Sequence, residues 1–214
     1  MKKVTNILLA TPMLPPSLGG PAIHAKKIAD FFGAQPDKYS IDLWDFEKLN
    51  VFPSGLRHAL AFFQIFLKSQ NKDIIFAFDG FSVALPAVLV GKILGKRVVL
   101  RIGGDLVHEQ FAEIVPVSMN DFYDNFQAYK EKMSWGLNLK MLIQRFIYKN
   151  TSLIIFTTEW QKKIYEKFYK LPSNNFVIMN PADHINLSKI EDFSYGNQNT
   201  FLSATRPVAF KNLV

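Results

Sequence analysis

The chain has 214 residues, which is enough for one full domain or for one domain and part of another. Hydrophobic residues make up 49% of it and 20 residues are Phe, so a large core can form and disorder is excluded for most of the chain. Cys is absent, which excludes disulfides, a thiolate nucleophile and Cys-ligated zinc, and the net charge of +7 suggests contact with an anionic partner.

Phosphorylated small molecules and an anionic membrane surface both fit this charge, whereas nucleic acid is not expected, because no helix-turn-helix, zinc or RNA-binding signature is present. The apolar run after the basic start Met1-Lys2-Lys3 is short and leads into prolines, so we interpret it as a strand and not as a signal peptide. No stretch approaches the ~20 apolar residues of a membrane span. We therefore expect a cytoplasmic protein.

The first predicted unit is a strand over residues 4–10, a loop that contains Gly19-Gly20, and a helix from residue 22 to about 32. A buried strand, a glycine-rich turn and a helix start are typical of a doubly wound α/β domain, in which the helix N-terminus can bind an anion. The alternative is an ordinary turn, since the spacing is not Gly-x-Gly-x-x-Gly. The helix is expected to bury its large apolar side chains, Ile23, Ile28, Phe31 and Phe32.

Strands and helices then alternate, which predicts a mostly parallel, Rossmann-like sheet with helices on both faces. The further predicted strands cover residues 39–45, 73–78, 97–102, 153–157 and 176–179. The predicted helices cover residues 55–70, 82–94, 137–150 and 159–169, with Gly95 ending the second of these and Thr158 capping the last.

The helix over residues 55–70 is apolar almost all round, and such a helix is normally buried. A contact with a membrane surface is the alternative, since Arg57 and Lys68 lie near its ends. The segment from residue 103 to about 135 is long, aromatic and acidic in patches. It predicts either a lid or binding loop or a pair of short surface helices.

Four blocks together resemble the N-terminal half of the group 1 (family 4) retaining glycosyltransferases, which have the two-Rossmann GT-B fold. These blocks are the Gly19-Gly20 loop, the strand that ends in Gly104-Asp105, the stretch from Ser152 to Asn180-Pro181-Ala182-Asp183, and residues 201–212. The last block is the most specific, because Arg206 and Lys211 stand at the spacing of the family's Arg-x-x-x-x-Lys motif.

The resemblance implies a hexosyltransferase-type enzyme that moves a sugar from a nucleotide-diphosphate sugar to an acceptor, with retention. From the basic charge and the apolar helix over residues 55–70, we expect a glycan or lipid-linked acceptor in cell-surface polysaccharide synthesis. Arg206 and Lys211 would neutralise the diphosphate leaving group, and the Gly19-Gly20 backbone would approach donor phosphate or acceptor. Family members usually need no metal or other cofactor. The implied division is an acceptor-side domain over residues 1–184, a linker over 185–199, and the start of a nucleotide-sugar domain over 200–214.

The chain departs from the family after the fourth strand, where many members carry a histidine and this chain has Gly103-Gly104-Asp105. We hypothesise that Asp105 orients an acceptor hydroxyl, with His108 or Glu109 beside it, because sites in α/β sheets lie at the carboxyl ends of strands. A metal site formed by these three residues is a minor alternative. The remaining histidines, His24, His58 and His184, are interpreted as structural or surface residues.

The sequence stops soon after the Arg206 to Lys211 motif, before the family's Glu-x-x-x-x-x-x-x-Glu region. We therefore expect this chain to be inactive alone, as a fragment or as one half of a split enzyme with a complementary C-terminal domain. Peripheral contact with the inner face of a membrane is a further expectation from the basic charge and the apolar helix. The alternative to an enzyme is a non-catalytic α/β binding module, because fold does not fix function.

Overall fold

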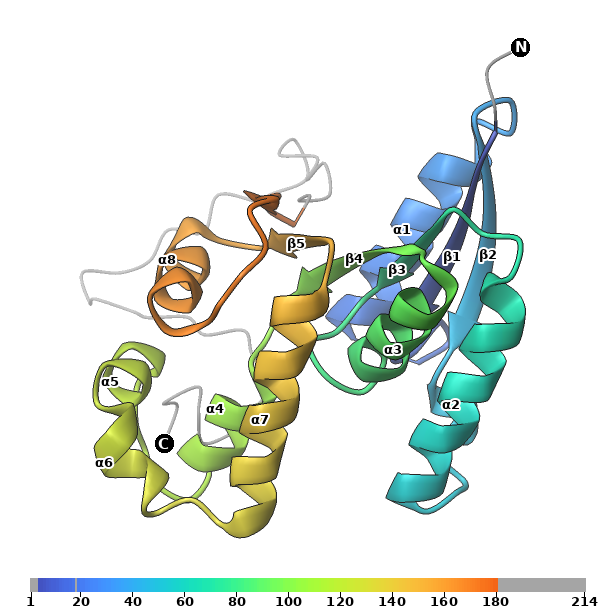
Figure 1. Cartoon of the computed structure of the whole chain (residues 1–214). Coiled ribbons are helices and arrows are strands. Elements are labelled where there is room, and N and C mark those ends of the chain that lie inside the picture. Colours follow the sequence, from blue (N-terminus) through green and yellow to red (C-terminus); the bar gives the residue numbers. More distant parts are fainter. Residues whose placement is uncertain (1–3, 18, 181–214) are drawn as a thin grey trace, which may run out of the picture.

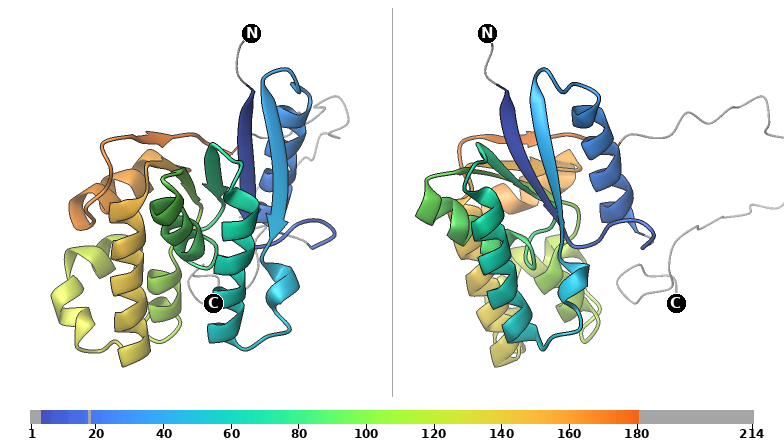
Figure 2. Two further views of the ribbon diagram at one scale, coloured as in Figure 1. Left: turned by 45° about the vertical axis from the view of Figure 1, so that its right-hand side comes forward. Right: turned by 90° about the vertical axis from the view of Figure 1, so that its right-hand side faces the viewer.

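The computed structural model describes residues 4–17 and 19–180, and its centre is a six-stranded sheet (Figure 1). The strands lie in the order β2-β1-β3-β4-β5-β6, and every neighbouring pair is parallel. Helices lie on both faces of this sheet (Figure 2). The chain moves from β1 to one side for β2 and to the other side for β3, which creates a switch point of the kind where α/β sheets bind ligands. The predicted Rossmann-like α/β fold is confirmed.

The strands agree closely with those predicted from the sequence. β2 and β4 have the predicted bounds, and the ends of the other four differ by one or two residues. The observed strands are β1 (Thr5–Thr11), β2 (Tyr39–Asp45), β3 (Ile74–Ala77), β4 (Arg97–Ile102), β5 (Leu153–Phe156) and β6 (Asn175–Val177). Continuous apolar runs mark the central strands because both faces of a parallel sheet are buried.

The longer helices lie within two residues of their predicted bounds. They are α1 (Gly20–Gly33), α2 (Ser54–Ser69), α3 (Ala84–Leu94), α7 (Trp135–Asn150) and α8 (Glu159–Phe168), with a short 3-10 helix, η1 (Glu47–Leu49), before α2. Gly95 ends α3 in the left-handed region with φ of 64°, and the hydroxyl of Thr158 accepts a hydrogen bond from the Gln161 amide at the start of α8. Both predicted helix-end signals are therefore confirmed.

The aromatic segment after β4 contains three short helices, α4 (Leu106–Ala112), α5 (Met119–Asp124) and α6 (Phe126–Lys130). The rings of Phe111, Phe122 and Phe126 are buried in the main core. Of the two alternatives for this segment, short helices are therefore correct in kind, although there are three of them and they pack into the domain.

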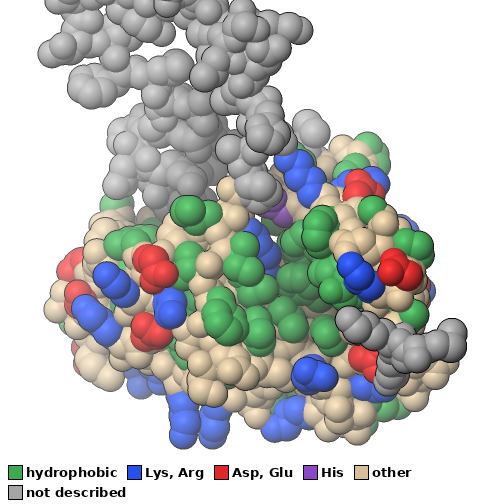
Figure 3. Space-filling view, turned by 90° about the horizontal axis from the view of Figure 1, so that it is seen from above, with side chains coloured by type: hydrophobic (Ala, Val, Ile, Leu, Met, Phe, Trp, Pro, Cys, Tyr) green, Lys and Arg blue, Asp and Glu red, His purple; other side chains and the backbone are tan. Residues whose placement is uncertain are grey.

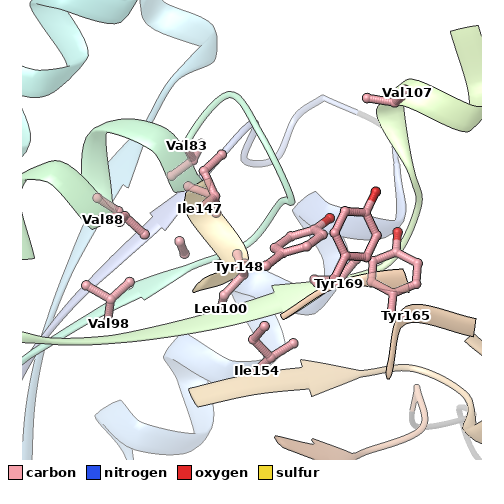
Figure 4. Close-up of a cluster of buried hydrophobic side chains, with 14 of the residues drawn as sticks. Val83, Val88, Val98, Leu100, Val107, Ile147, Tyr148, Ile154, Tyr165 and Tyr169 are labelled. Atoms are coloured by element: carbon pink, nitrogen blue, oxygen red, sulfur yellow. The ribbon is translucent and has the colours of Figure 1, made fainter. Parts of the chain in front are cut away.

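The alternation of side chains along the strands produces two cores. Leu8, Ile75, Leu100 and Ile154 belong to the larger one, which lies under α2, α3 and α7 (Figure 4). On the other face, a smaller cluster packs with α1, and it includes Ile7, Leu9, Phe76, Phe78 and Ile155. Seen from above, the molecule shows hydrophobic side chains gathered in a central hollow (Figure 3).

The expected buried face of α1 is wrong in part. Ala22, Ala25 and Ala29 form its buried face, whereas Ile23 and Phe31 are exposed. Only Ile28 and Phe32 of the expected set pack against the small cluster. Small side chains face the sheet here because they let the helix backbone lie close to β1 and β2.

The expectation that α2 is a buried helix is also wrong. It buries Ala61, Ile65 and Ser69 and leaves Leu56, Phe63 and Leu67 exposed to solvent. None of the helices in the described part of the chain combines the length and the apolar character needed to cross a bilayer. The outward apolar side chains of α2 therefore need a different explanation from either core packing or membrane spanning.

Candidate functional site

A cavity of about 510 Å³ lies at the carboxyl edge of the sheet. Its walls come from the loops and strand ends after β3, β4, β5 and β6, from the starts of α1 and α4, and from the last turn of α7. The lining residues include Gly20, Pro21, His24, Phe78, Asp79, Gly80, Arg101, Gly103, Gly104, Glu109, Tyr148, Thr157 and Asn180. This is the edge at which the sequence analysis expected a ligand.

The N-terminus of α1 opens into this cavity. Gly19 is the N-cap residue and Gly20 and Pro21 form the first helical positions, with no side chain capping the end. Gly20 lines the cavity, and a Cβ added to it would meet no atom within 4 Å. A Cβ on Gly19 would come within 3.1 Å of the Met13 sulfur. Amides at such a helix start are free to bind an anion, although Pro21 contributes none.

Arg101, near the end of β4, is a cavity residue that the sequence analysis missed. Its side chain is buried, packs over the ring of Phe78 at 5.8 Å and donates a hydrogen bond to the side-chain oxygen of Asn180. Burial lowers the pKa of Arg101, because desolvation penalises its charged form. No carboxylate in the described ranges pairs with it. A single cation inside an apolar strand was the signal that could have identified it.

Asp79 is a second missed cavity residue. Its carboxylate accepts hydrogen bonds from the amides of Phe81 (2.9 Å) and Val83 (3.0 Å), and from the hydroxyl of Ser82. These bonds hold the turn that leads from β3 into α3. Asp79 therefore shapes one wall of the cavity, and its acceptor atoms are already occupied by neighbouring groups of the turn.

Glu109 is the one member of the predicted acceptor-side trio that lines the cavity. Its carboxylate accepts a hydrogen bond of 3.2 Å from the backbone amide of Asp105. The same carboxylate lies against Gly104, where an added Cβ would stand 2.4 Å from the Glu109 oxygen. Gly104 thus leaves room for this carboxylate at the mouth of the loop after β4.

Asp105 is buried, and it is not among the residues that line the cavity. One carboxylate oxygen caps α4 by accepting hydrogen bonds of 3.0 Å from the amides of Val107 and His108. The other oxygen accepts hydrogen bonds from the hydroxyls of Tyr123 and, at 2.6 Å, Tyr165. Both carboxylate oxygens of Asp105 thus accept hydrogen bonds from groups inside the protein.

The hydroxyls around Asp105 form a larger network. Tyr123 and Tyr169 share a hydrogen bond of 2.7 Å, and the Gln144 amide donates to Tyr148 at 2.9 Å and to Tyr169 at 3.2 Å. Figure 4 shows the rings of Tyr148, Tyr165 and Tyr169 close together. Burial, followed by the charge of Asp105, raises the pKa of these three tyrosines and of Tyr123 well above 10. All four are therefore neutral donors at ordinary pH.

The histidines differ in their surroundings. His108 is buried, with Nε2 3.0 Å from the carbonyl oxygen of Val117, and it does not line the cavity. His58 contacts the carbonyl oxygen of Ser54 through Nδ1, which agrees with a structural role. His24 lines the cavity, at the first turns of α1. His184 lies outside the described residues.

Some predicted site features are not tested by this geometry. The segment from Pro181 onward lies outside the described residues, and it includes Arg206, Lys211, the predicted linker over 185–199 and the expected start of a second domain over 200–214. Within the described residues, no group of three His, Cys, Asp or Glu side chains is placed to hold a metal ion.

Comparison with known proteins gives matches at the level of structure only. No protein-family model and no curated protein matches the sequence. Among solved structures, a UDP-N-acetylglucosamine 2-epimerase from Listeria monocytogenes matches with a TM-score of 0.54 at 9% identity, over 81% of this chain and 44% of that one. The chain thus spans less than half of that protein.

Two plant proteins match more distantly. UGT73P12 of Glycyrrhiza uralensis, in complex with glycyrrhetinic acid 3-O-monoglucuronide, has a TM-score of 0.48 at 9% identity, over 81% of this chain and 48% of that chain. A UDP-glucosyltransferase from Polygonum tinctorium capable of glucosylating indoxyl has a TM-score of 0.42 at 12% identity, over 99% and 57%. The epimerase likeness bears on the fold alone, and it agrees with the parallel, Rossmann-like sheet described above.

Proposed function

We propose that this chain is the acceptor-side part of a GT-B glycosyltransferase that uses a nucleotide-diphosphate sugar as donor and retains the anomeric configuration. The observation that carries the proposal is the cavity at the carboxyl edge, where the N-terminus of α1 and the buried cation Arg101 meet. Positive groups on two walls of one cavity favour an anionic ligand. The acceptor is a glycan or a lipid-linked sugar of cell-surface polysaccharide synthesis.

On the donor side, the diphosphate leaves as its bond to the sugar carbon breaks, and it gains negative charge in that step. Arg206 and Lys211 supply the neutralising charge in this proposal, and the backbone at Gly19 and Gly20 approaches the phosphate or the acceptor across the cleft between two domains. Charge stabilisation of this kind is the largest contribution in many such sites. The second domain belongs to the same proposal, as a continuation of the chain or as a separate partner.

On the acceptor side, Glu109 is the group that contacts the acceptor hydroxyl, since its carboxylate lines the cavity. Asp105 and His108 act through it as positioning residues, because both hold α4 by hydrogen bonds at or near its ends. Arg101 binds the anionic part of a ligand. No metal ion takes part in this proposal.

Binding of an anion to the cavity is the first test. Pyrophosphate or UDP is titrated into the chain by calorimetry, and Arg101→Gln is compared with Arg97→Gln. Arg97 begins the same strand and is exposed, so it controls for the loss of one positive charge. We expect Arg101→Gln to weaken binding about tenfold or more and Arg97→Gln to leave it unchanged, since hydrogen bonds to charged groups contribute about 1.5–3 kcal/mol. Equal affinity in all three proteins would remove the basis of the proposal.

Transfer is then measured with the complete product of the reading frame, or with the complementary domain added. A panel of nucleotide sugars is supplied, and release of nucleoside diphosphate is followed. Substitution of Arg206 or Lys211 by Ala should reduce this release, while Lys167→Ala on the exposed side of α8 should have no effect. Proton NMR of the product reports whether the anomeric configuration is retained. Binding of a ligand without any turnover would instead identify a non-catalytic binding module.

A further inference from the structure

The three helices that cover the larger core contain no acidic residue. α2, α3 and α7 lie side by side on one face of the sheet, with α3 in contact with both of the others (Figures 1 and 2). Their sequences contain no Asp or Glu, although both are common in surface helices. They do contain six Lys and Arg residues: Arg57, Lys68, Lys92, Lys140, Arg145 and Lys149.

Two of these helices also carry the same pattern of outward apolar side chains. On α2 the positions are Leu56, Leu60, Phe63 and Leu67, and on α7 they are Trp135, Leu139, Leu142 and Phe146. Both sets have the spacing i, i+4, i+7, i+11, which places them along one face of a helix. Seven of the eight are exposed, with Trp135 80% and Leu67 71% accessible, and Leu60 is half-buried.

These two stripes lie on the sides of α2 and α7 that face away from the core. On α2, Ala61 and Ile65 lie about half a helical turn from the stripe and are buried. On α7, Leu137, Met141 and Gln144 occupy the corresponding buried side. Ile93 of α3, between them, is exposed as well, at 62%. The outer surface of the three helices is thus apolar along its ridges and positively charged beside them.

We propose that this outer surface of α2, α3 and α7 binds the surface of an anionic lipid bilayer. Apolar side chains on the outer face of a helix bury themselves at the boundary between headgroups and acyl chains, and flanking Lys and Arg attract anionic lipids. Trp favours this interface because its ring is apolar and its N–H is polar. The proposal does not depend on glycosyl transfer.

The other helices show that this pattern is not general to the protein. α1 also exposes large apolar side chains, Ile23 and Phe31, but it carries Asp30 in an ion pair with Lys26. α8 exposes Trp160 and carries Glu159 and Glu166 beside its lysines. The absence of negative charge is therefore particular to the three helices of the proposed surface, among the longer helices described.

Charge also argues against a second copy of the chain as the occupant. A symmetric dimer through this surface would place each set of cations opposite its own copy, with no acidic residue on these helices to pair with them. An anionic bilayer offers the complementary charge together with an apolar phase. A bilayer of this kind therefore complements both the positive charge and the exposed apolar side chains of the surface.

The test is co-sedimentation of the chain with vesicles of phosphatidylcholine, with and without phosphatidylglycerol. We expect binding to the anionic vesicles that falls as salt rises, because charged attraction is screened. Phe63→Ser together with Leu142→Ser should reduce the bound fraction about tenfold, since binding scales with buried apolar area. Phe31→Ser on α1 removes an equally exposed Phe from the opposite side and should bind like the wild type.

Fluorescence of Trp135 gives a second readout. In a Trp160→Phe background, only Trp135 and the buried Trp44 remain, so a blue shift on adding anionic vesicles reports burial of Trp135. Lack of vesicle binding at low salt would overturn the proposal, as would equal binding by the Phe63→Ser, Leu142→Ser protein. Concentration-dependent dimers that these substitutions abolish, without vesicle binding, would assign the surface to a second copy instead.

Discussion

The hydroxyl of Tyr165 donates a hydrogen bond of 2.6 Å to the carboxylate of Asp105, which lies 60 residues earlier in the chain. This bond joins the start of α4, at the edge of the cavity, to the inner side of α8. Tyr123 donates to the same oxygen from α5, so one buried carboxylate connects three helices. Asp105, which was expected to contact an acceptor, therefore also holds three helices of the fold together.

Replacement of Asp105 by Ala should destabilise the protein by about 2–4 kcal/mol, because it removes a helix cap and leaves buried tyrosine hydroxyls without their acceptor. Urea unfolding followed by circular dichroism measures this. Asp124→Ala, at an exposed position of α5, is the control and should change the stability by less than about 0.5 kcal/mol. If Asp105→Ala is as stable as the wild type, the hydrogen bonds seen here contribute nothing to the fold.

Under the proposed function, substitution at Glu109 and at Asp105 should affect turnover and stability differently. Glu109→Gln should lower kcat and leave the unfolding midpoint unchanged, since this side chain lies at the cavity. Asp105→Asn should lower kcat and the midpoint together, because it disturbs the tyrosine network. A fall in kcat for Asp105→Asn with unchanged stability would instead favour direct contact between Asp105 and the acceptor.

The protein should lose stability steeply above pH 10. The folded-state pKa values of Tyr123, Tyr148, Tyr165 and Tyr169 are raised well above the ordinary value of 10.0. The unfolded chain therefore releases these protons at a pH where the native state still holds them. The stability is fully present below pH 10 and decreases above it, by about 1.4 kcal/mol per pH unit for each such group.

Tyrosinate absorbance and circular dichroism during alkaline titration test this expectation. Ionisation of the four buried tyrosines should coincide with unfolding and should not precede it. Tyr165→Phe removes one titrating group, so its stability should fall less steeply with pH above 10. Reversible ionisation of all tyrosines near pH 10 with the fold intact would contradict the raised pKa values.

Gly91 lets α3 lie directly against β4, and Gly91→Ala should be destabilising by about 1–3 kcal/mol. An added Cβ would stand 2.3 Å from a methyl carbon of Val98 and 3.2 Å from the carbonyl oxygen of Lys96. Val98→Ala removes that methyl group, so the double variant should lose less than the sum of the two single changes. Gly136→Ala, in open space on α7, should be neutral or stabilising by up to about 1 kcal/mol. Additive effects in the Gly91 and Val98 cycle would argue against this contact.

Gly104→Ala should reduce the proposed transfer activity without a comparable loss of stability. The new methyl group would displace the flexible carboxylate of Glu109 from its place beside the loop after β4. Gly103→Ala is the matched control, because a Cβ there meets nothing within 4 Å. We expect kcat to fall for the first variant only, and equal activity of both variants would exclude a role for the observed position of Glu109.

The sequence predicted those parts of the fold that depend on local patterns. The continuous apolar run Val98-Val99-Leu100 predicted β4, and Gly95 marked the end of α3, because each signal arises from neighbouring residues. The site residues were harder to predict than the fold, because their surroundings depend on contacts between residues far apart in the sequence. The carboxylate of Asp105 is occupied by tyrosines 18 and 60 residues away, and no pattern within the segment after β4 reveals that.

Two errors have a common physical cause. In α1 the large apolar residues were expected on the buried side, and α2 was expected to be buried because it is apolar almost all round. Alanines instead face the sheet in α1, and bulky side chains face solvent in α2. Close packing selects side chains by size as well as by polarity, so small residues occupy positions where backbones approach. Arg101 was not predicted as a site residue, because the role of a cation in a buried strand can be inferred only when the cavity beside it is known.

α7 borders both the cavity and the proposed lipid-binding surface. Tyr148 on its inner side lines the cavity, and Leu142 and Phe146 on its outer side belong to the surface proposed to meet lipid. An α-helix with its side chains is about 10–12 Å across. A substrate held in the bilayer by its tail would therefore need only a short spacer between tail and reacting sugar to reach from the lipid headgroups into the cavity. The dependence of the transfer rate on the spacer length of a series of acceptors would therefore measure the distance between the lipid headgroups and the cavity.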